Sequence, residues 1–500
     1  MKRLFLILLV IATLLIAGCT TSQNPDSPVS AGNALNARAD QEYAAANYGT
    51  AAELYRLARE NFTAEGNTTG ALAARDGISR SHRMIMEFPY NRSMMNQVLA
   101  KSFPDIPAET REAWLNGNDT ITITSDGETL YFEDTAANFL FHNMTLVRKF
   151  FAAGHGSPFN DQLTPFVFAP VNESQVPYGK PVAWQGTETI SVPRNELPAN
   201  GTLKIWFPLP IESGSQTNVT IVSIEPAQYL KSTTGTTGDI GIAYLEVPLG
   251  EQNDPFLNIT ATYRFVQHEQ RFVIDPVKVL PYNTSGPEYR KFTASSANIA
   301  VSPEIRAKAK EIVGNETNPH LQAQKIYWYI VDTLPYSHVP HMMLTNSGIP
   351  ESEFVFTTGF GDCGTQSTYF AALCRSLGIP ARTTGGFQLV PGSAGTHFWA
   401  EYYLEGYGWI PVDVTAAEAG DWAYNATDEE RHQFKAYYFG GLDPYRYIIQ
   451  NDADQPLTPD PGNAVLIRSV FQGPAVVCDT CPDDPELLIA SHFTADTVQV

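Results

Sequence analysis

The chain is poor in cysteine and in basic residues, and its apolar N-terminal run is short. Five cysteines in 500 residues are too few for a disulfide scaffold. With 32 Lys and Arg against 53 Asp and Glu, the formal net charge is -21. A non-specific nucleic-acid binder is excluded, because it needs basic side chains to displace counterions from phosphates. The apolar run from Leu4 to Ala17 is shorter than the roughly 20 residues that cross a bilayer as a helix.

The composition is that of an ordered protein with several domains. Apolar residues make up 43% of the chain and aromatic residues 11%, which is enough to bury a core and excludes wholesale disorder. A length of 500 residues predicts three or four domains, at roughly 100 to 200 residues each.

The N-terminus has the pattern of an export signal. Met1-Lys2-Arg3 is basic, the apolar run follows, and Leu15-Ile16-Ala17-Gly18 leads into Cys19. This resembles the lipobox of secreted lipoproteins. The resemblance implies cleavage before Cys19 and attachment of diacylglycerol to its sulfur, so we expect a signal peptide (1–18), a tether (19–35) and a membrane-anchored protein at the cell surface. The alternative is an uncleaved anchor helix.

Acceptor sites for N-glycosylation are frequent. The chain has 27 Asn and 12 Asn-x-Ser/Thr sequons, about three times the number that its composition predicts. Asn-Thr pairs also mark turns, but together with the signal the excess favours a glycosylated, extracytoplasmic surface. The longest gap between sequons runs from Asn315 to Asn425.

The remaining pattern predicts a multidomain α+β protein. Ala and aromatic residues recur at helical spacing from Arg38 to Met86, which resembles one and a half tetratricopeptide repeats. The pattern predicts a TPR-like helical hairpin or a three-helix cap, and the alternative is a groove that binds a peptide of a protein partner. Short β-branched runs between Val182 and Val277 predict an antiparallel sandwich. The expected parts after the tether are a helical hairpin (36–90), a small α+β module (91–181), a β-sandwich-like domain (182–295), a catalytic core (296–450) and a C-terminal tail (451–500).

A segment around Cys363 has the features of a nucleophile site. Gly361 and Asp362 precede Cys363, and a helical pattern follows it, so the cysteine is expected at a helix start. Unpaired N–H groups and the helix dipole at that position would lower the thiol pKa. The alternative is an inert, buried cysteine, which is the expectation for Cys374 on the apolar face of the same helix.

A hairpin downstream carries the two residues that a thiol nucleophile needs. The run from His397 to Leu404 alternates as a strand, Glu405 to Gly408 turns, and a second strand leads to Asp413. A cysteine, a histidine base and a carboxylate that orients the imidazole form a catalytic triad. His397 and Asp413 share a face only if the paired residue numbers have an even sum, as with Tyr403 opposite Trp409.

These motifs resemble the transglutaminase-like superfamily. The resemblance rests on Gly361-Asp362-Cys363, on the helix end Leu373 to Arg382, on His397-Phe398-Trp399-Ala400-Glu401 and on Gly408 to Thr415, and it covers residues 300 to 420. It implies a papain-related α+β core with Cys363 as nucleophile, His397 as base and Asp413 as the residue that orients it. The family often has Pro after the Asp, where this chain has Val414.

Other candidate residues are less specific. Tyr336 is a candidate second oxyanion donor beside the Cys363 N–H, or a core tyrosine. His338 and His341 have no acidic or cysteine ligands close in sequence, so no metal and no cofactor are expected. Cys478 and Cys481 lie in a Pro- and Asp-rich tail without a second ligand pair or a βαβ pattern, which favours a local disulfide.

The predicted reaction is acyl transfer through a thioester. The substrate would be a protein or peptide amide, and we expect hydrolysis rather than cross-linking, because no second-substrate site is evident. The rival hypothesis is a non-catalytic envelope lipoprotein in which the Cys363 domain serves as a scaffold.

Overall fold

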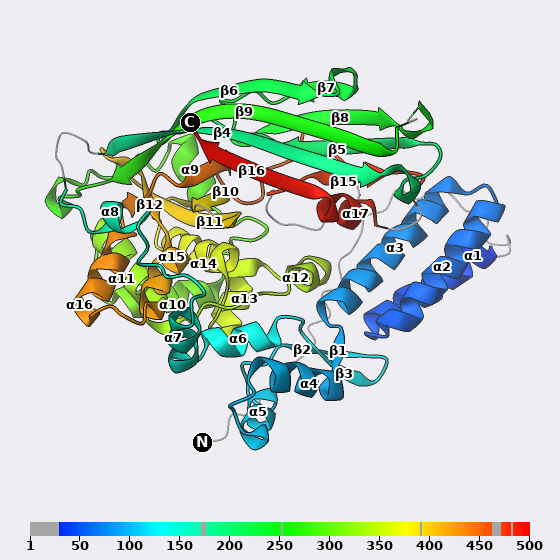
Figure 1. Cartoon of the computed structure of the whole chain (residues 1–500), viewed down its shortest axis with the longest axis horizontal. Helices are drawn as coiled ribbons and strands as arrows, with labels where there is room; N and C mark the ends of the chain where they lie inside the picture. The colour runs from blue at the N-terminus through cyan, green and yellow to red at the C-terminus, as the bar shows by residue number, and fades with distance from the viewer. Residues whose placement is uncertain (1–29, 172–176, 252–253, 391–392, 463–471, 482–483) are drawn as a thin grey trace.

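The computed structural model describes the chain except residues 1–29, 172–176, 252–253, 391–392, 463–471 and 482–483 (Figure 1). Cys19 and the whole predicted signal peptide lie outside the described residues. In the described part, no helix combines the length and apolar character needed to cross a membrane. Figure 1 shows β-sheets above a helix-rich core, with a helical arm on one side and a small mixed module below.

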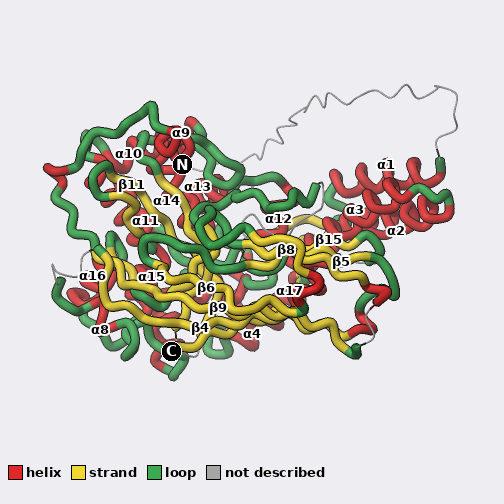
Figure 2. Tube along the Cα trace, turned by 90° about the horizontal axis from the view of Figure 1, so that it is seen from above, coloured by secondary structure: helices red, strands yellow, loops and turns green. Residues whose placement is uncertain are grey.

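The N-terminal arm is a bundle of three helices. Its helices are α1 (Ala31–Ala44), α2 (Tyr48–Ala64) and α3 (Thr68–Glu87). Small residues let the helices approach closely, because a Cβ on Gly77 would lie 2.6 Å from the ring of Tyr55. Figure 2 shows the three helices side by side at one end of the molecule. The predicted helical N-terminus is therefore present, and its first helix begins before residue 36.

The small mixed module contains a three-stranded sheet and short helices. Its elements are β1 (Tyr90–Asn91), α4 (Arg92–Ser102), α5 (Ala108–Leu115), β2 (Thr122–Ser125), β3 (Glu128–Tyr131), α6 (Thr135–Phe141), α7 (Met144–Ala152) and α8 (Thr164–Val167). Ser125 pairs with Glu128, and Asp126 and Gly127 both have positive φ, of 49° and 81°. These residues form a two-residue hairpin turn between β2 and β3, since a tight turn of this kind requires left-handed backbone at both positions.

Two antiparallel sheets form a sandwich above the core. Its first strands are β4 (Tyr178–Pro193), β5 (Thr202–Pro208), β6 (Gln216–Glu225), β7 (Leu230–Thr233), β8 (Ile242–Pro248) and β9 (Phe256–Arg271). One sheet has the order β13 (Gly441–Leu442), β9, β4 and β16 (Phe493–Gln499), with β6 also on β9. The other has the order β15 (Ala475–Cys478), β5, β8 and β7. Ile190 and Ile259 from one sheet share an apolar cluster with Ile205 and Leu245 from the other, which makes the two sheets one domain.

The C-terminal segment completes this sandwich. The expected tail (451–500) contains β15 (Ala475–Cys478), α17 (Pro485–Ser491) and β16 (Phe493–Gln499). β15 pairs with β5, and β16 pairs with β4. Local sequence could not reveal this, because each partner strand lies more than 250 residues away. The segment is therefore part of the sandwich and not a separate tail.

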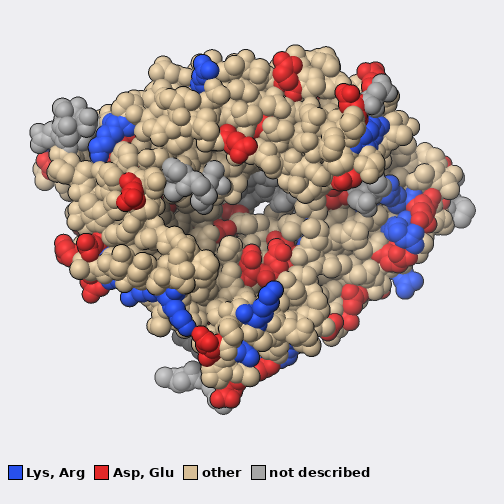
Figure 3. Space-filling view, in the orientation of Figure 1, with Lys and Arg blue, Asp and Glu red and all other residues tan. Residues whose placement is uncertain are grey.

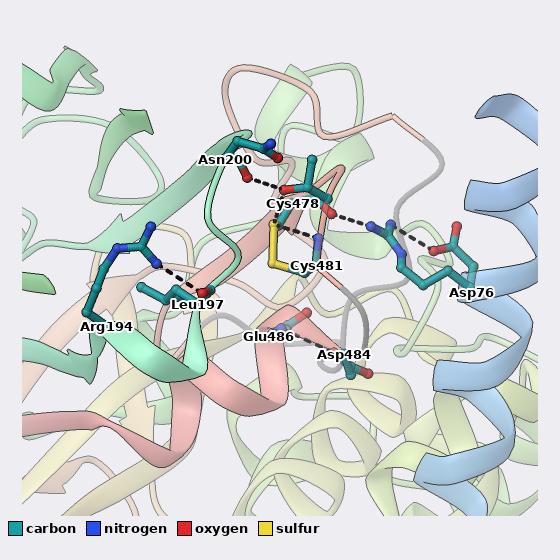
Figure 4. Close-up of a disulfide and its surroundings, with 10 residues drawn as sticks. Asp76, Arg194, Leu197, Asn200, Cys478, Cys481, Asp484 and Glu486 are labelled. Carbon is teal, nitrogen blue, oxygen red and sulfur yellow. Dashed lines mark hydrogen bonds and ion pairs between the residues drawn. A yellow bond between two sulfur atoms is a disulfide. The ribbon is translucent and has the colours of Figure 1, made fainter. Parts of the chain in front are cut away.

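Cys478 and Cys481 form a disulfide at the end of β15, the pairing that the C-x-x-C spacing predicts. Both cysteines are buried. Figure 4 shows the bond beside α3, where the Arg75 guanidinium contacts the Cys478 carbonyl and Asp76. This short stretch therefore joins the sandwich to the helical arm.

The core places one buried helix against a four-stranded sheet. Its helices are α9 (Pro287–Thr293), α10 (Pro303–Val313), α11 (Pro319–Thr333), α12 (His341–Ser347), α13 (Glu351–Thr358), α14 (Cys363–Ser376), α15 (Val414–Glu418) and α16 (Asp428–Tyr437). Its strands are β10 (Ala381–Val390), β11 (Ser393–Leu404), β12 (Gly408–Val412) and β14 (Arg446–Gln450), whereas β13, between β12 and β14 in the chain, pairs with β9 of the sandwich. The sheet order is β12-β11-β10-β14, with all neighbours antiparallel. Nearly every residue of α14 is buried, so this helix is fixed by its surroundings.

Candidate active site

Cys363 is the first residue of α14. Gly359 ends α13 in the left-handed region with φ of 79°, and the chain turns directly into the new helix. The Asp362 carboxylate accepts a hydrogen bond from the Thr365 N–H at 2.9 Å, and the Asp362 N–H donates to the Thr365 hydroxyl at 2.9 Å. This reciprocal cap pairs the Thr365 N–H, while the N–H groups before it lack intrahelical partners, as at every helix start.

The β11–β12 hairpin has the register that the triad requires. Tyr403 pairs with Trp409 and Ala400 with Val412, so the paired numbers have an even sum, as predicted. The strand ends at Val412, and Asp413 caps α15 by accepting from the Ala416 N–H at 3.0 Å. His397 Nε2 lies 2.8 Å from Asp413 Oδ2. The structure therefore joins the predicted histidine and aspartate by a hydrogen bond.

Asp413 is fully buried and has a second cationic partner, Arg446 on β14. The Arg446 guanidinium forms an ion pair with Asp413 and another with Asp443 at 2.9 Å. Burial by itself would raise the pKa of Asp413, but the hydrogen bond and electrostatic interaction with His397 and the charge of Arg446 hold that pKa well below its usual range. Asp413 is therefore a carboxylate throughout the physiological range.

Cys363 and His397 line the same cavity, which has a volume of about 570 Å³. Burial raises the pKa of the Cys363 thiol, and the negative charges of Asp362 and Asp413 raise it further. The N–H groups of Phe398 and Gly364 oppose this shift by hydrogen bonding to the sulfur. The expectation of a lowered pKa at the helix start was wrong, because desolvation and two nearby carboxylates outweigh the backbone.

Tyr336 also lines this cavity. Its backbone forms a parallel bridge to Gly361, and the adjacent Ser337 N–H donates to the Gly361 carbonyl at 2.8 Å. The ring lies edge-on to Phe141 at a centroid distance of 5.1 Å. Burial holds the Tyr336 pKa well above its usual value, so the phenol stays neutral and can donate a hydrogen bond.

One wall of the cleft comes from the small module. Phe151, at the end of α7, and residues between His155 and Leu163 line the cavity. The Phe151 ring stacks parallel to that of Trp422, with 5.7 Å between their centroids. The segment from Met342 to Phe356 lies within α12, α13 and the turn between them, and it does not line this cavity.

Helix α6 and His142, which follows it, hold the segment that carries Tyr336. The Asn138 side chain donates to the His338 carbonyl at 3.0 Å and accepts from the His338 N–H at 2.7 Å. His142 Nε2 lies 2.5 Å from the Ser337 hydroxyl. The module with no function evident from the sequence therefore positions one wall of the candidate site.

Behind Cys363, His341 lies between two carboxylates that sequence spacing did not connect to it. Its Nε2 is 2.6 Å from Asp362 Oδ2, and its Nδ1 is 2.9 Å from Glu351 Oε1. Burial opposes protonation, but these two carboxylates hold the His341 pKa well above its usual value. The positive imidazole offsets the Asp362 charge next to the thiol.

The helical arm contacts the same cluster through Glu87. Its buried carboxylate accepts hydrogen bonds from the Met342 and Met343 N–H groups, at 2.7 and 2.6 Å. In the described residues, no group of three His, Cys, Asp or Glu side chains has a metal-binding arrangement. The cluster around His341 is therefore a set of ion pairs and helix caps.

The remaining predicted residues lie apart from the site. Cys374 is fully buried on α14, in the apolar core. Cys478 and Cys481 lie in the sandwich, bonded to each other. Arg446 was missed by sequence reasoning, because a lone arginine in the strand that follows Pro444 carries no local signal of an ion pair with Asp413.

A cysteine at the start of a buried helix shares a cavity with a histidine on an antiparallel sheet, and an aspartate at the end of the next strand bonds to that histidine. This is the arrangement of α+β thiol enzymes. Residues 306–414, which include all three side chains, match the model of the transglutaminase-like superfamily. Residues 306–414 are therefore a transglutaminase-like domain.

Similar proteins cover parts of the chain. An uncharacterised protein from Haemophilus influenzae is 27% identical over 212 residues, which are 37% of this chain and 56% of that protein. The chain thus spans little more than half the length of this relative. A crystal structure of a candidate cysteine protease from Cytophaga hutchinsonii is 16% identical, covers 65% of this chain and 92% of that one, and has a TM-score of 0.40. The periplasmic domain of TgpA from Pseudomonas aeruginosa is 17% identical, covers 47% of this chain and 96% of that one, and has a TM-score of 0.24.

Proposed function

We propose that this protein is an extracytoplasmic cysteine enzyme that cleaves protein or peptide amides. The observation that supports this best is the 2.8 Å contact between His397 and Asp413 at a cavity that also exposes Cys363. A non-catalytic scaffold has no need to bury a charged aspartate beneath a histidine beside a half-buried cysteine, because the desolvation of such charges is costly.

The side chains would act in sequence on a carbonyl carbon. His397 takes the thiol proton of Cys363 as the sulfur attacks, since the raised pKa keeps the resting sulfur protonated. Asp413 fixes the imidazole and stabilises its charged form. The Cys363 N–H and the Tyr336 hydroxyl would donate to the oxyanion. The C–N bond then breaks, His397 returns the proton to the departing amine, and a thioester remains.

Water then completes the proposed reaction. His397 removes a proton from water, the hydroxide attacks the thioester, the C–S bond breaks, and the thiol regains its proton. Cys363 is only partly buried, so water can reach the thioester, which favours hydrolysis over cross-linking. An amine in place of that water would give transamidation instead.

The decisive experiment measures release of ammonia and peptide fragments from a casein-like substrate, with and without an added primary amine. We expect hydrolysis that Cys363→Ser abolishes and that the core variant Cys374→Ser retains. Amine incorporation above hydrolysis would show a cross-linking enzyme. No turnover, together with iodoacetamide labelling of Cys363 that is equal in wild type and His397→Ala, would favour the scaffold.

We also propose that the protein is an exported lipoprotein anchored through Cys19, with sequons on its outer surface. Figure 3 shows acidic and basic side chains scattered over one face of the molecule, as on a solvated surface. The helical arm, with its TPR-like spacing, would then be free to bind a protein partner. Loss of membrane association in a Cys19→Ser variant, measured by cell fractionation, would support the anchor.

A further inference from the structure

A second cavity, of about 260 Å³, lies at the end of the β11–β12 hairpin, away from Cys363. Tyr403, on its wall, follows His397 by six residues on the same strand, which separates the two by roughly 20 Å at about 3.3 Å per residue. The cavity is lined by four aromatic residues and two glutamates, namely Tyr282, Tyr289, Tyr403, Trp409, Glu288 and Glu405.

The aromatic rings form two angled pairs. Tyr282 and Tyr289 have a centroid distance of 5.5 Å, and Tyr403 and Trp409 one of 5.4 Å. The Tyr282 hydroxyl donates to the Tyr403 carbonyl at 2.7 Å, which holds the two pairs together. This wall is therefore built before any ligand arrives.

The two glutamates give the cavity negative charge. In the part of the chain that the structure describes, neither the Glu288 nor the Glu405 carboxylate has a hydrogen bond or ion pair to another residue. Their charges reach the aromatic wall, because both raise the pKa of Tyr403, after the larger effect of burial. Arg382, which lies 4.1 Å from the centre of the Trp409 ring, is paired with Glu401.

We propose that this cavity binds the ammonium group of a lysine side chain on a protein or peptide. Aromatic faces attract a cation through their quadrupole, and two free carboxylates can accept hydrogen bonds from a primary ammonium. A quaternary ammonium has no N–H to donate, so the glutamates favour lysine. The net charge of -21 also draws basic chains toward the protein.

Together with the proposed function, the cavity is an exosite for basic protein substrates. The binding itself does not rest on that function. It is therefore measured in full-length Cys363→Ala protein, where no turnover occurs, so failure of one proposal leaves the other standing.

The test is calorimetric titration with Nα-acetyl-lysine methylamide, its norleucine analogue and choline. We expect lysine to bind more tightly than norleucine, and the double variant Glu288→Gln/Glu405→Gln to weaken it about fivefold or more. Glu304→Gln, on α10, is the matched control and should change nothing. Melting temperatures verify folding, and Glu405→Gln alone serves if the double variant is unstable.

Three outcomes would overturn the proposal. The first is equal binding of the lysine and norleucine compounds, and the second is an affinity for the lysine compound that is unchanged in both glutamate variants. The third is tighter binding of choline than of the lysine compound, which would assign the cavity to a quaternary ammonium.

Discussion

Asp413 and Arg446 meet in the interior with no exposure to solvent, and the guanidinium contacts Oδ2, the same carboxylate oxygen that faces the imidazole of His397. Arg446 thus acts on the candidate active site through Asp413, and it does not line the cavity itself. Its side chain also lies 5.1 Å from the centre of the Trp399 ring, which fixes it in place.

Replacing Arg446 with Met should strongly destabilise the protein. The substitution leaves two buried carboxylates, Asp413 and Asp443, without their cation, and breaking a buried ion pair in this way costs about 3 to 5 kcal/mol. Urea unfolding should show a lower midpoint. The double variant Arg446→Met/Asp443→Asn should recover part of the loss, and exposed Lys310→Met should have no effect. An unchanged midpoint in Arg446→Met would show that the ion pairs contribute little.

Tyr336→Phe should lower kcat and leave KM nearly unchanged. The phenol lines the cavity with Cys363, and loss of one oxyanion donor typically reduces kcat by about 100- to 1000-fold. Steady-state kinetics on the best amide substrate measure kcat and KM separately. Tyr329→Phe on α11 is the control for removal of a phenol elsewhere. A rise in KM with constant kcat would instead mean that Tyr336 contributes to substrate binding and not to stabilisation of the transition state.

Glu87→Ala should loosen the contact between the helical arm and α12. The carboxylate accepts from two partly buried N–H groups at the start of that helix, and a fully buried donor left unpaired costs about 1 to 3 kcal/mol, which is the upper bound for each. Hydrogen exchange at Met342 and Met343 should become faster, and the melting temperature should fall. Exposed Glu65→Ala is the control. Equal exchange in the two variants would show that the arm does not stabilise α12.

The site residues could be predicted where the chemistry is local. A Gly-Asp-Cys turn before an apolar helix, and a hairpin with His on one strand and Asp after the next, carry their signal in spacing and in period. The even register, with Tyr403 opposite Trp409, was a deduction from strand geometry, and the structure confirms it. The catalytic roles of these residues remain predictions.

The parts of the fold and of the site that could not be predicted depend on contacts between segments far apart in the sequence. Arg446 lies on β14, far along the chain from Asp413 at the start of α15. His341 contacts Asp362 only because α12 and α13 bring it back to the start of α14. The β16 strand joins β4 although about 300 residues separate them, so no local pattern indicates the pairing. The pKa of Cys363 was mispredicted for a related reason, because burial and the charge of Asp413 come from tertiary structure and not from its own helix.

Glu188→Gln should stabilise the protein at alkaline pH. Glu188 is fully buried in β4, where its carboxyl accepts hydrogen bonds from the Tyr263 and Tyr447 hydroxyls, and burial raises its pKa to about 8. In the unfolded chain the pKa is about 4.3, so the folded state binds more protons between these values, and stability falls as pH rises from about 4 to 8.

Glutamine keeps the acceptor oxygen and never ionises. The two proteins should therefore be similar near pH 4 to 5, and Glu188→Gln should gain a few kcal/mol, in order of magnitude, by pH 8 to 9. Urea unfolding midpoints across this pH range measure the difference in stability between the two proteins. The pH dependence of all other groups cancels in that difference. Glu251→Gln, at an exposed turn, should track wild type throughout. A difference between Glu188→Gln and wild type that is constant with pH would mean that Glu188 is already ionised in the folded protein at the lowest pH tested.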